Sequence, residues 1–146
     1  MIKKLLLSAT IIFILTLSHS QAQMTAGVYK GTFYSQLGIG SNPENKFFGE
    51  GRLFAGDFLN PLFGIEGIGQ YNFIATDWYN LSGGIMFGYH QFDNGRVGLQ
   101  GMLAIKPIEG HRNLALILET TPFYSNFDFT LRANIGIRYT LGRNRE

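Results

Sequence analysis

The sequence predicts an all-β protein, folded as an antiparallel, up-and-down transmembrane β-barrel of eight strands, seven of which can be delimited from the sequence. Three observations lead to this fold class. Strand-like segments recur at a nearly constant spacing, apolar and polar residues alternate within most of them, and a secretory leader precedes them. Only short connections join the segments, which favours strands that pair with their neighbours in sequence.

The repeat runs from about residue 29 to residue 141. Alternation gives a strand two faces of different character. In residues 63–74, Phe63, Ile65 and Tyr71 share one face, and Glu66 and Gln70 share the other. After a first strand at residues 29–39, the segments begin 16 or 17 residues apart, at Phe47, Phe63, Tyr79, Arg96, Asn113 and Phe129. The four prolines (Pro43, Pro61, Pro107 and Pro122) are predicted to lie at strand ends, because proline cannot donate to a ladder.

Residues 1–22 have the composition of a signal peptide. Lys3 and Lys4 form a positive n-region, residues 5–18 form an apolar stretch of 14 residues, and Ser20 and Ala22 mark a small-x-small cleavage site. A transmembrane helix is disfavoured because it needs about 20 apolar residues. Residues 23–146 are therefore expected to form a single β-barrel domain.

Charge and cysteine content exclude several classes of protein. Without Lys3 and Lys4, 10 basic residues balance 10 acidic ones, so there is no reason to expect a nucleic-acid partner. The absence of cysteine excludes a lipid-anchored lipoprotein and a disulfide scaffold. Charged residues make up 15% of the chain, below the roughly 25% of soluble domains. A lipid-facing surface would explain that deficit.

Alternation alone does not show which face is inside, because a soluble barrel also alternates. Two sets of residues and the scarcity of lysine favour the membrane arrangement, in which the polar face is inside. Charges of both signs, which can pair in a narrow lumen, share the polar face: Glu50, Arg52, Glu66, Arg96, Lys106, Glu119, Arg132 and Arg138. Aromatic residues near strand ends share the apolar face: Tyr29, Phe63, Tyr71, Phe73, Tyr79, Phe87, Tyr89 and Tyr139. Two segments alternate less well, since Phe54, Phe58 and Ile117 fall on the polar face.

Bacterial single-chain barrels have an even number of strands, so we expect an eighth strand in addition to the seven that are delimited. Either residues 24–40 form two short strands, or residues 114–129 contain a further reversal. If the first strand is single, the turns at residues 59–62 and 92–95 face the periplasm. The loops at residues 41–46, 75–78 and 108–112 would then face outward.

The leader, the alternating strands and the terminal segment at residues 134–142 resemble small outer-membrane β-barrel proteins of Gram-negative bacteria, similar in kind to OmpX and to the transmembrane domain of OmpA. In that group, a last strand that alternates and ends near an aromatic residue is read by the barrel-assembly machinery. The resemblance implies location in the outer membrane, with outer-membrane lipids and that machinery as partners. The polar tail at residues 143–146 departs from the pattern.

Candidate catalytic residues are few, and we assign no catalytic, cofactor-binding or metal-binding residue. His90 lies near Asp93, and His111 follows Glu109, but no nucleophile or third ligand accompanies either pair. The inner charges could line a channel, yet an eight-stranded barrel has an interior just filled by side chains, which favours a packed ion-pair network.

The sequence therefore favours a non-enzymatic outer-membrane barrel with a structural, envelope or adhesive role. A soluble periplasmic barrel that binds a lipid or another apolar ligand is the first alternative. A lipid A-modifying outer-membrane enzyme is the second, although the His-x-Ser pattern of such enzymes is missing.

Overall fold

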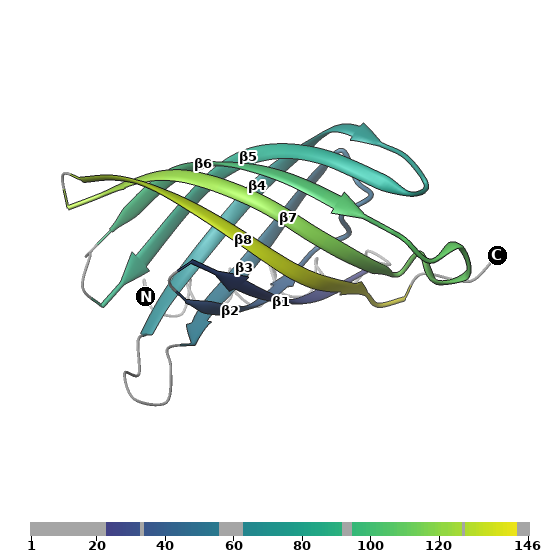
Figure 1. Cartoon of the computed structure of the whole chain (residues 1–146), viewed down its shortest axis with the longest axis horizontal. Coiled ribbons are helices and arrows are strands. Elements are labelled where there is room, and N and C mark those ends of the chain that lie inside the picture. The colour runs from purple at the N-terminus through teal and green to yellow at the C-terminus, as the bar shows by residue number, and fades with distance from the viewer. Residues whose placement is uncertain (1–22, 33, 56–62, 92–94, 127, 143–146) are drawn as a thin grey trace, which may run out of the picture.

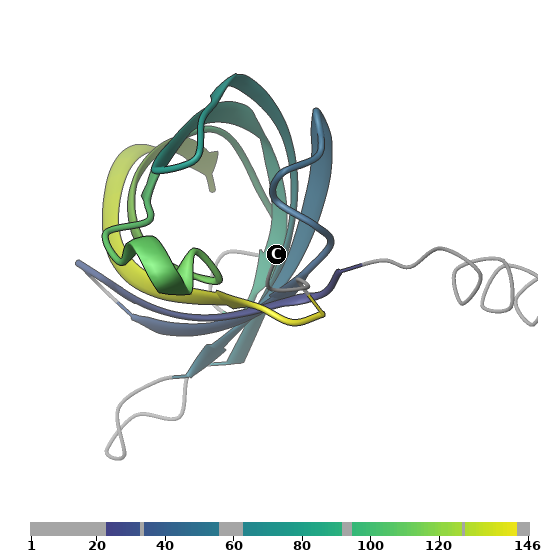
Figure 2. The same cartoon turned by 90° about the vertical axis from the view of Figure 1, so that its right-hand side faces the viewer.

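In the computed structural model, which describes residues 23–32, 34–55, 63–91, 95–126 and 128–142, the chain forms one closed antiparallel barrel (Figures 1 and 2). Each strand pairs with the next, and β1 pairs with β8 to close the sheet. The eight-stranded barrel predicted from the sequence is thus confirmed. The strands are β1 (Thr25–Gly31), β2 (Ser35–Gly40), β3 (Phe47–Ala55), β4 (Phe63–Ala75), β5 (Tyr79–His90), β6 (Arg96–Ile105), β7 (Leu114–Ser125) and β8 (Asp128–Thr140). The signal peptide predicted at residues 1–22 lies outside the described residues.

The eighth strand comes from the N-terminal segment, which folds into the β1–β2 hairpin. The backbone N–H of Gly31 donates to the carbonyl of Tyr34 at its tip (2.9 Å). Tyr29 pairs with Gln36 across the hairpin, so these two side chains share a face. The turn changes the phase of alternation, and the prediction of a single strand at residues 29–39 was wrong. Tyr29 therefore lies inside the barrel and Lys30 outside, the reverse of the predicted faces.

The remaining strands have the predicted orientation, with apolar side chains outward and polar ones inward. Leu99 is 64% exposed and Ile135 is 52% exposed. All eight charged residues predicted on the inner face are buried, as are Phe54 and Ile117; Phe58 lies outside the described residues. The predicted outer aromatics, apart from Tyr29, lie near both ends of the wall: Phe63, Phe87 and Tyr89 at one end, and Tyr71, Phe73, Tyr79 and Tyr139 at the other.

β7 extends past the strand end that the sequence predicted at Pro122. The proline lies within the strand and not at its end. The strand continues to Ser125, and Pro122 pairs with Leu131 of β8. On the β6 side, the ladder has no pairs between Gly98–Phe123 and Gly101–Thr120. The proline thus lies where β7 and β6 are not paired, so its missing N–H costs little.

β1 begins and β8 ends on the same side of the barrel, which is called here the terminal end. The opposite side of the barrel is called the far end. Thr25 pairs with Gly40 and with Thr140 there. The loops at residues 41–46, 75–78 and 108–112 lie at the terminal end, on the right of Figure 1. The turns predicted at residues 59–62 and 92–95 fall between β3 and β4 and between β5 and β6, and residues 56–62 and 92–94 lie outside the described part. The predicted sidedness assumed a single first strand and falls with that assumption.

The 3₁₀-helix η1 (Glu109–His111) lies between β6 and β7 at the terminal end. Within the described ranges, no helix is long and apolar enough to cross a membrane.

Glycines on the inner face make room for large side chains. The ring of Tyr29 lies over Gly38 and Gly136: an added Cβ would come within 2.9 Å of Cε2 at Gly38 and would overlap Cδ1 at Gly136. Gly88 lies under the Glu66 side chain in the same way, with 2.6 Å between a Cβ and Cγ. Contacts this close exclude a side chain at these glycines. Large inward side chains therefore fill the narrow lumen by lying over inward glycines, which have no side chain.

Candidate functional site

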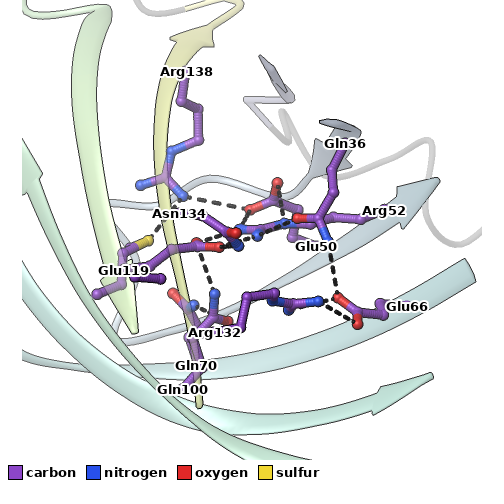
Figure 3. Close-up of polar contacts among 12 residues, drawn as sticks. Gln36, Glu50, Arg52, Glu66, Gln70, Gln100, Glu119, Arg132, Asn134 and Arg138 are labelled. Carbon is purple, nitrogen blue, oxygen red and sulfur yellow. Dashed lines mark hydrogen bonds and ion pairs between the residues drawn. The ribbon is translucent and has the colours of Figure 1, made fainter. Parts of the chain in front are cut away.

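The barrel interior contains a connected set of polar side chains, called here the polar belt (Figure 3). No member is more than 6% exposed, and the side chains come from β2, β3, β4, β6, β7 and β8. The belt consists of Gln36, Glu50, Arg52, Glu66, Gln70, Gln100, Glu119, Arg132, Asn134 and Arg138. Strict alternation explains this gathering, because every second residue of each strand must point into the lumen.

Arg52 is the centre of the belt. Its guanidinium donates to both carboxylate oxygens of Glu119, at 2.5 and 2.8 Å, and to both oxygens of Glu50, at 3.1 and 3.3 Å. Nη1 also donates to Oε1 of Gln36 (3.2 Å). The guanidinium carbon lies 3.8 Å from the centroid of the Tyr29 ring, a close cation–π contact. One arginine thus links β3 to β1, β2 and β7.

Glu119 accepts from three strands. Besides the two bonds from Arg52, it accepts from Nε2 of Gln100 (2.7 Å) and from Nδ2 of Asn134. Gln100 in turn accepts from Nε2 of Gln70 (2.8 Å). A buried carboxylate is tolerated only when charge and hydrogen bonds compensate its lost hydration. Glu119 has both kinds of compensation.

A second ion pair lies beside the first and is bidentate. Arg132 donates from Nη1 and Nη2 to the two oxygens of Glu66, at 2.8 and 2.9 Å. Gln36 bridges the two pairs, because its Nε2 donates to Glu66 (3.4 Å) while its oxygen accepts from Arg52. A third pair joins Arg138 to Glu50 at 3.6 Å. Together with the pair of Arg52 and Glu50, these make four ion pairs in one network across the lumen.

The belt is electrically balanced and packed. Three carboxylates (Glu50, Glu66 and Glu119) face three guanidinium groups (Arg52, Arg132 and Arg138). The arginines are among the largest fully buried side chains of the described residues. Ion pairs and hydrogen bonds across the lumen hold the strands together, although Nε of Arg132, Nε of Arg138 and Oδ1 of Asn134 have no hydrogen-bond partner among the described residues, and the side chains occupy the space that a solute would need. The arrangement is that of a structural plug.

The two histidines considered from the sequence lie at opposite ends of the barrel. His90 is buried at the far end, with its ring 5.2 Å from the ring of Tyr34 and 5.8 Å from that of Phe54. His111 is exposed in η1 at the terminal end, beside Glu109. Asp93 lies outside the described residues. Among those described, no three His, Asp or Glu side chains gather to hold a metal ion.

The far end of the lumen contains a cation among aromatic rings. Arg96 is 4% exposed, and its guanidinium carbon lies 5.2–5.6 Å from the ring centroids of Tyr34, Phe54 and Phe123. Nη2 of Arg96 donates to the Tyr34 hydroxyl (3.1 Å). Alternation placed Arg96 correctly on the inner face, but it did not identify the rings around it. These come from three other strands or turns.

At the terminal end, the β2–β3 loop (residues 41–46) is bound to the barrel mouth. The carbonyl of Pro43 accepts from Nδ2 of Asn72 (2.8 Å) and of Asn80 (3.2 Å). Nζ of Lys106 donates to both oxygens of Glu44, at 2.9 and 3.1 Å. These partners lie on β4 and β5 and at the end of β6, so the loop crosses the mouth. The sequence marked residues 41–46 only as a polar loop, and no motif pointed to this role.

Comparison of the fold with solved structures finds the outer membrane protein Ail of Yersinia pestis, whose backbone structure is that in a phospholipid bilayer nanodisc. The superposition has a TM-score of 0.56 and covers 82% of this chain and 99% of Ail, at 8% sequence identity. This chain has the fold of an outer-membrane barrel. Its sequence matches no protein-family model and no curated protein. At this identity the likeness concerns architecture and not activity.

Proposed function

We propose that the protein is exported by its signal peptide and spans the outer membrane as a closed, non-enzymatic barrel with a structural role in the cell envelope. The observation that carries the proposal is the inverted wall: Leu99 and Ile135 point outward, while the charged polar belt lies inside. A bilayer is the solvent in which such a wall is stable. The likeness to Ail, an outer membrane protein, supports the same environment.

The orientation follows from export. The chain reaches the membrane from the periplasm, and strands cross as hairpins, so the terminal end stays in the periplasm. The loop at residues 41–46 then faces the periplasm, and the β1–β2 and β7–β8 turns face the outside. The machinery that assembles barrels would read β8, which alternates to its end at Thr140.

The charged interior disfavours the soluble, lipid-binding alternative. A barrel that carries a lipid in its cavity needs an apolar interior, whereas here six ionised side chains pair in the lumen. The enzymatic alternative is disfavoured because the sequence lacks the His-x-Ser pattern of lipid A-modifying enzymes. The packed belt likewise disfavours a channel.

Fractionation tests the location. We expect the protein in the outer-membrane fraction, with a folded form that migrates differently from the heated form on a gel. Recovery in the osmotic-shock supernatant would refute the membrane proposal. In planar bilayers we expect no steady single-channel currents from the purified barrel. Lipid A from a deletion strain should have an unchanged mass spectrum, and a changed one would favour the enzymatic alternative.

An adhesive role is a second candidate, favoured by the shape of the far end. The β1–β8 register ends at the Gly31–Asn134 pair, whereas β8 begins at Asp128. The β7–β8 hairpin therefore extends beyond the described residues of β1, and in Figure 1 it reaches furthest on the left. Such an edge can pair with a partner strand. Adherence of a deletion strain that is equal to that of the parent strain would dismiss this role.

A further inference from the structure

The outer wall has a hollow over β3, β4 and β5. Its volume is about 570 Å³, and it lies within the apolar band of the wall. The outward-facing residues that line it are Phe47, Gly49, Gly69, Tyr71, Gly83 and Ile85. The floor is thus made of glycines, and the rim is made of aromatic and aliphatic side chains. Ser41, from the β2–β3 loop, lines the hollow at the terminal end.

Four outward glycines on β3 and β4 form two facing pairs, Gly49 with Gly69 and Gly51 with Gly67. An added Cβ would meet nothing within 4 Å at Gly67 or Gly69, and its nearest contacts would be 3.5 Å at Gly49 and 3.9 Å at Gly51. None of the four has a positive φ. The barrel's own backbone and packing therefore do not require glycine here, in contrast to the inner glycines beneath Tyr29.

Glycine weakens a strand interior, and four together leave a gap in the wall, of which Gly49 and Gly69 line the hollow. In strands, such a gap marks a place where a ligand or another backbone approaches closely. Gly83 is different, because an added Cβ would come within 2.8 Å of the Phe73 ring. The gap thus lies on β3 and β4, with Phe73 covering the neighbouring glycine.

The chemistry of the rim identifies the occupant. The hollow itself is apolar, and a positive charge lies beside its rim at the terminal end, where the Lys46 ammonium lies 5.5 Å from the centroid of the Tyr71 ring. Glu44, two residues away, is ion-paired with Lys106 inside the mouth. A ligand that fits has a hydrocarbon chain and, at one end of it, an anionic group.

We propose that this hollow binds one acyl chain of an anionic phospholipid of the adjacent leaflet, with the phosphate of the lipid headgroup beside Lys46. The inference rests on the proposed function, since it needs a barrel that spans a membrane with its terminal end toward the phospholipid leaflet. The glycine floor lets the chain lie against the backbone, and the basic residue at the interface attracts the anionic headgroup.

Native mass spectrometry of the purified full mature chain tests the site. The barrel is released from nanodiscs that contain equal amounts of phosphatidylglycerol and phosphatidylcholine, and the retained lipids are counted. We expect one retained lipid per barrel, with phosphatidylglycerol favoured at least threefold. Gly49→Leu/Gly69→Leu should abolish retention of both lipids. Lys46→Gln should retain one lipid and lose the preference.

Ala133→Leu is the matched control, because it adds an apolar side chain to the outward face of β8, away from the hollow. It should retain lipid as the wild type does. Equal retention by the filled variant, or an unchanged preference in Lys46→Gln, would overturn the proposal. So would a wild-type dimer that becomes monomeric when the hollow is filled, since a second copy would then be the occupant.

The folded state is checked separately by heat-modifiable migration. If Gly49→Leu/Gly69→Leu does not fold, Gly69→Val and Lys46→Gln carry the test. Failure of the proposed function has a different signature, in which neither the wild type nor Ala133→Leu enters nanodiscs. A barrel that inserts normally and retains no lipid would refute the lipid site alone.

Discussion

The polar belt makes a quantitative prediction at Glu119. Glu119→Leu removes two charge-assisted bonds from Arg52 and the acceptors of Gln100 and Asn134. Arg52 keeps Glu50, so part of its charge stays compensated. Removal of one partner of a buried ion pair costs about 3–5 kcal/mol, and we expect a loss of unfolding free energy in this range.

The double variant Arg52→Met/Glu119→Leu separates the pair from the cost of an unpaired charge. It leaves two matched pairs in the lumen, Arg138 with Glu50 and Arg132 with Glu66. Replacing both partners by apolar side chains is often nearly neutral. We therefore expect the double variant to be more stable than Glu119→Leu, with a coupling energy of about 1–3 kcal/mol.

The measurement is reversible urea unfolding in phospholipid vesicles, followed by the fluorescence of Trp78, the chain's single tryptophan. The two single variants, Arg52→Met and Glu119→Leu, and the double variant together form a double-mutant cycle. Additivity of the two single effects within about 0.5 kcal/mol would refute the reasoning, because it would mean that Arg52 and Glu119 do not interact through their charges.

Three further changes test the wall, the loop and the packing. Leu99→Arg and Ile135→Arg should each cost about 2–4 kcal/mol in vesicles if they face the midplane, and a loss under about 0.5 kcal/mol in urea unfolding would contradict the outward assignment. Lys106→Met should remove the ion pair that holds the β2–β3 loop, so limited proteolysis should cut the loop faster; an unchanged rate would show that the asparagine contacts suffice. Gly136→Leu should destabilise the barrel by about 1–3 kcal/mol through a clash in the lumen, whereas Gly67→Leu should stay within about 1 kcal/mol of wild type, and equal melting temperatures would contradict the difference.

The sequence predicted most of the wall because alternation is a local property. Residues such as Arg132 and Glu66 alternate within their own strands, so their side of the sheet follows without knowledge of the partner strand. Two short strands in residues 24–40 were one of the two alternatives for the eighth strand, and the structure confirms it. The sequence could not locate the turn, because it has none of the Asn-Gly or Asp-Gly signals that mark such reversals. Without that turn, Tyr29 and Lys30 were assigned to the wrong faces.

The pairing within the lumen could not be predicted in the same way. Alternation shows that Arg52 points inward, but the choice of Glu119 as partner depends on barrel diameter and on strand stagger. The anchoring of the β2–β3 loop could not be predicted for the same reason, because Glu44 and Lys106 meet only across the mouth of the closed barrel. Such contacts belong to the shape of the barrel and not to any one segment.

The spacing of these contacts along the chain has a consequence for assembly. Arg52 and Glu119 are 67 residues apart, Arg132 and Glu66 are 66 apart, and Lys106 and Glu44 are 62 apart. Contacts at such separations form only after much of the chain has been ordered, which slows folding. An emerging hairpin therefore has only part of its ion-pair partners: Arg52 can reach Glu50 on its own strand, but Glu119 reaches Arg52 only after β7 is in place. Neutralisation of the interior is completed only when the distant strands meet, so an incomplete intermediate with unpaired inward charges is more stable in water than in lipid.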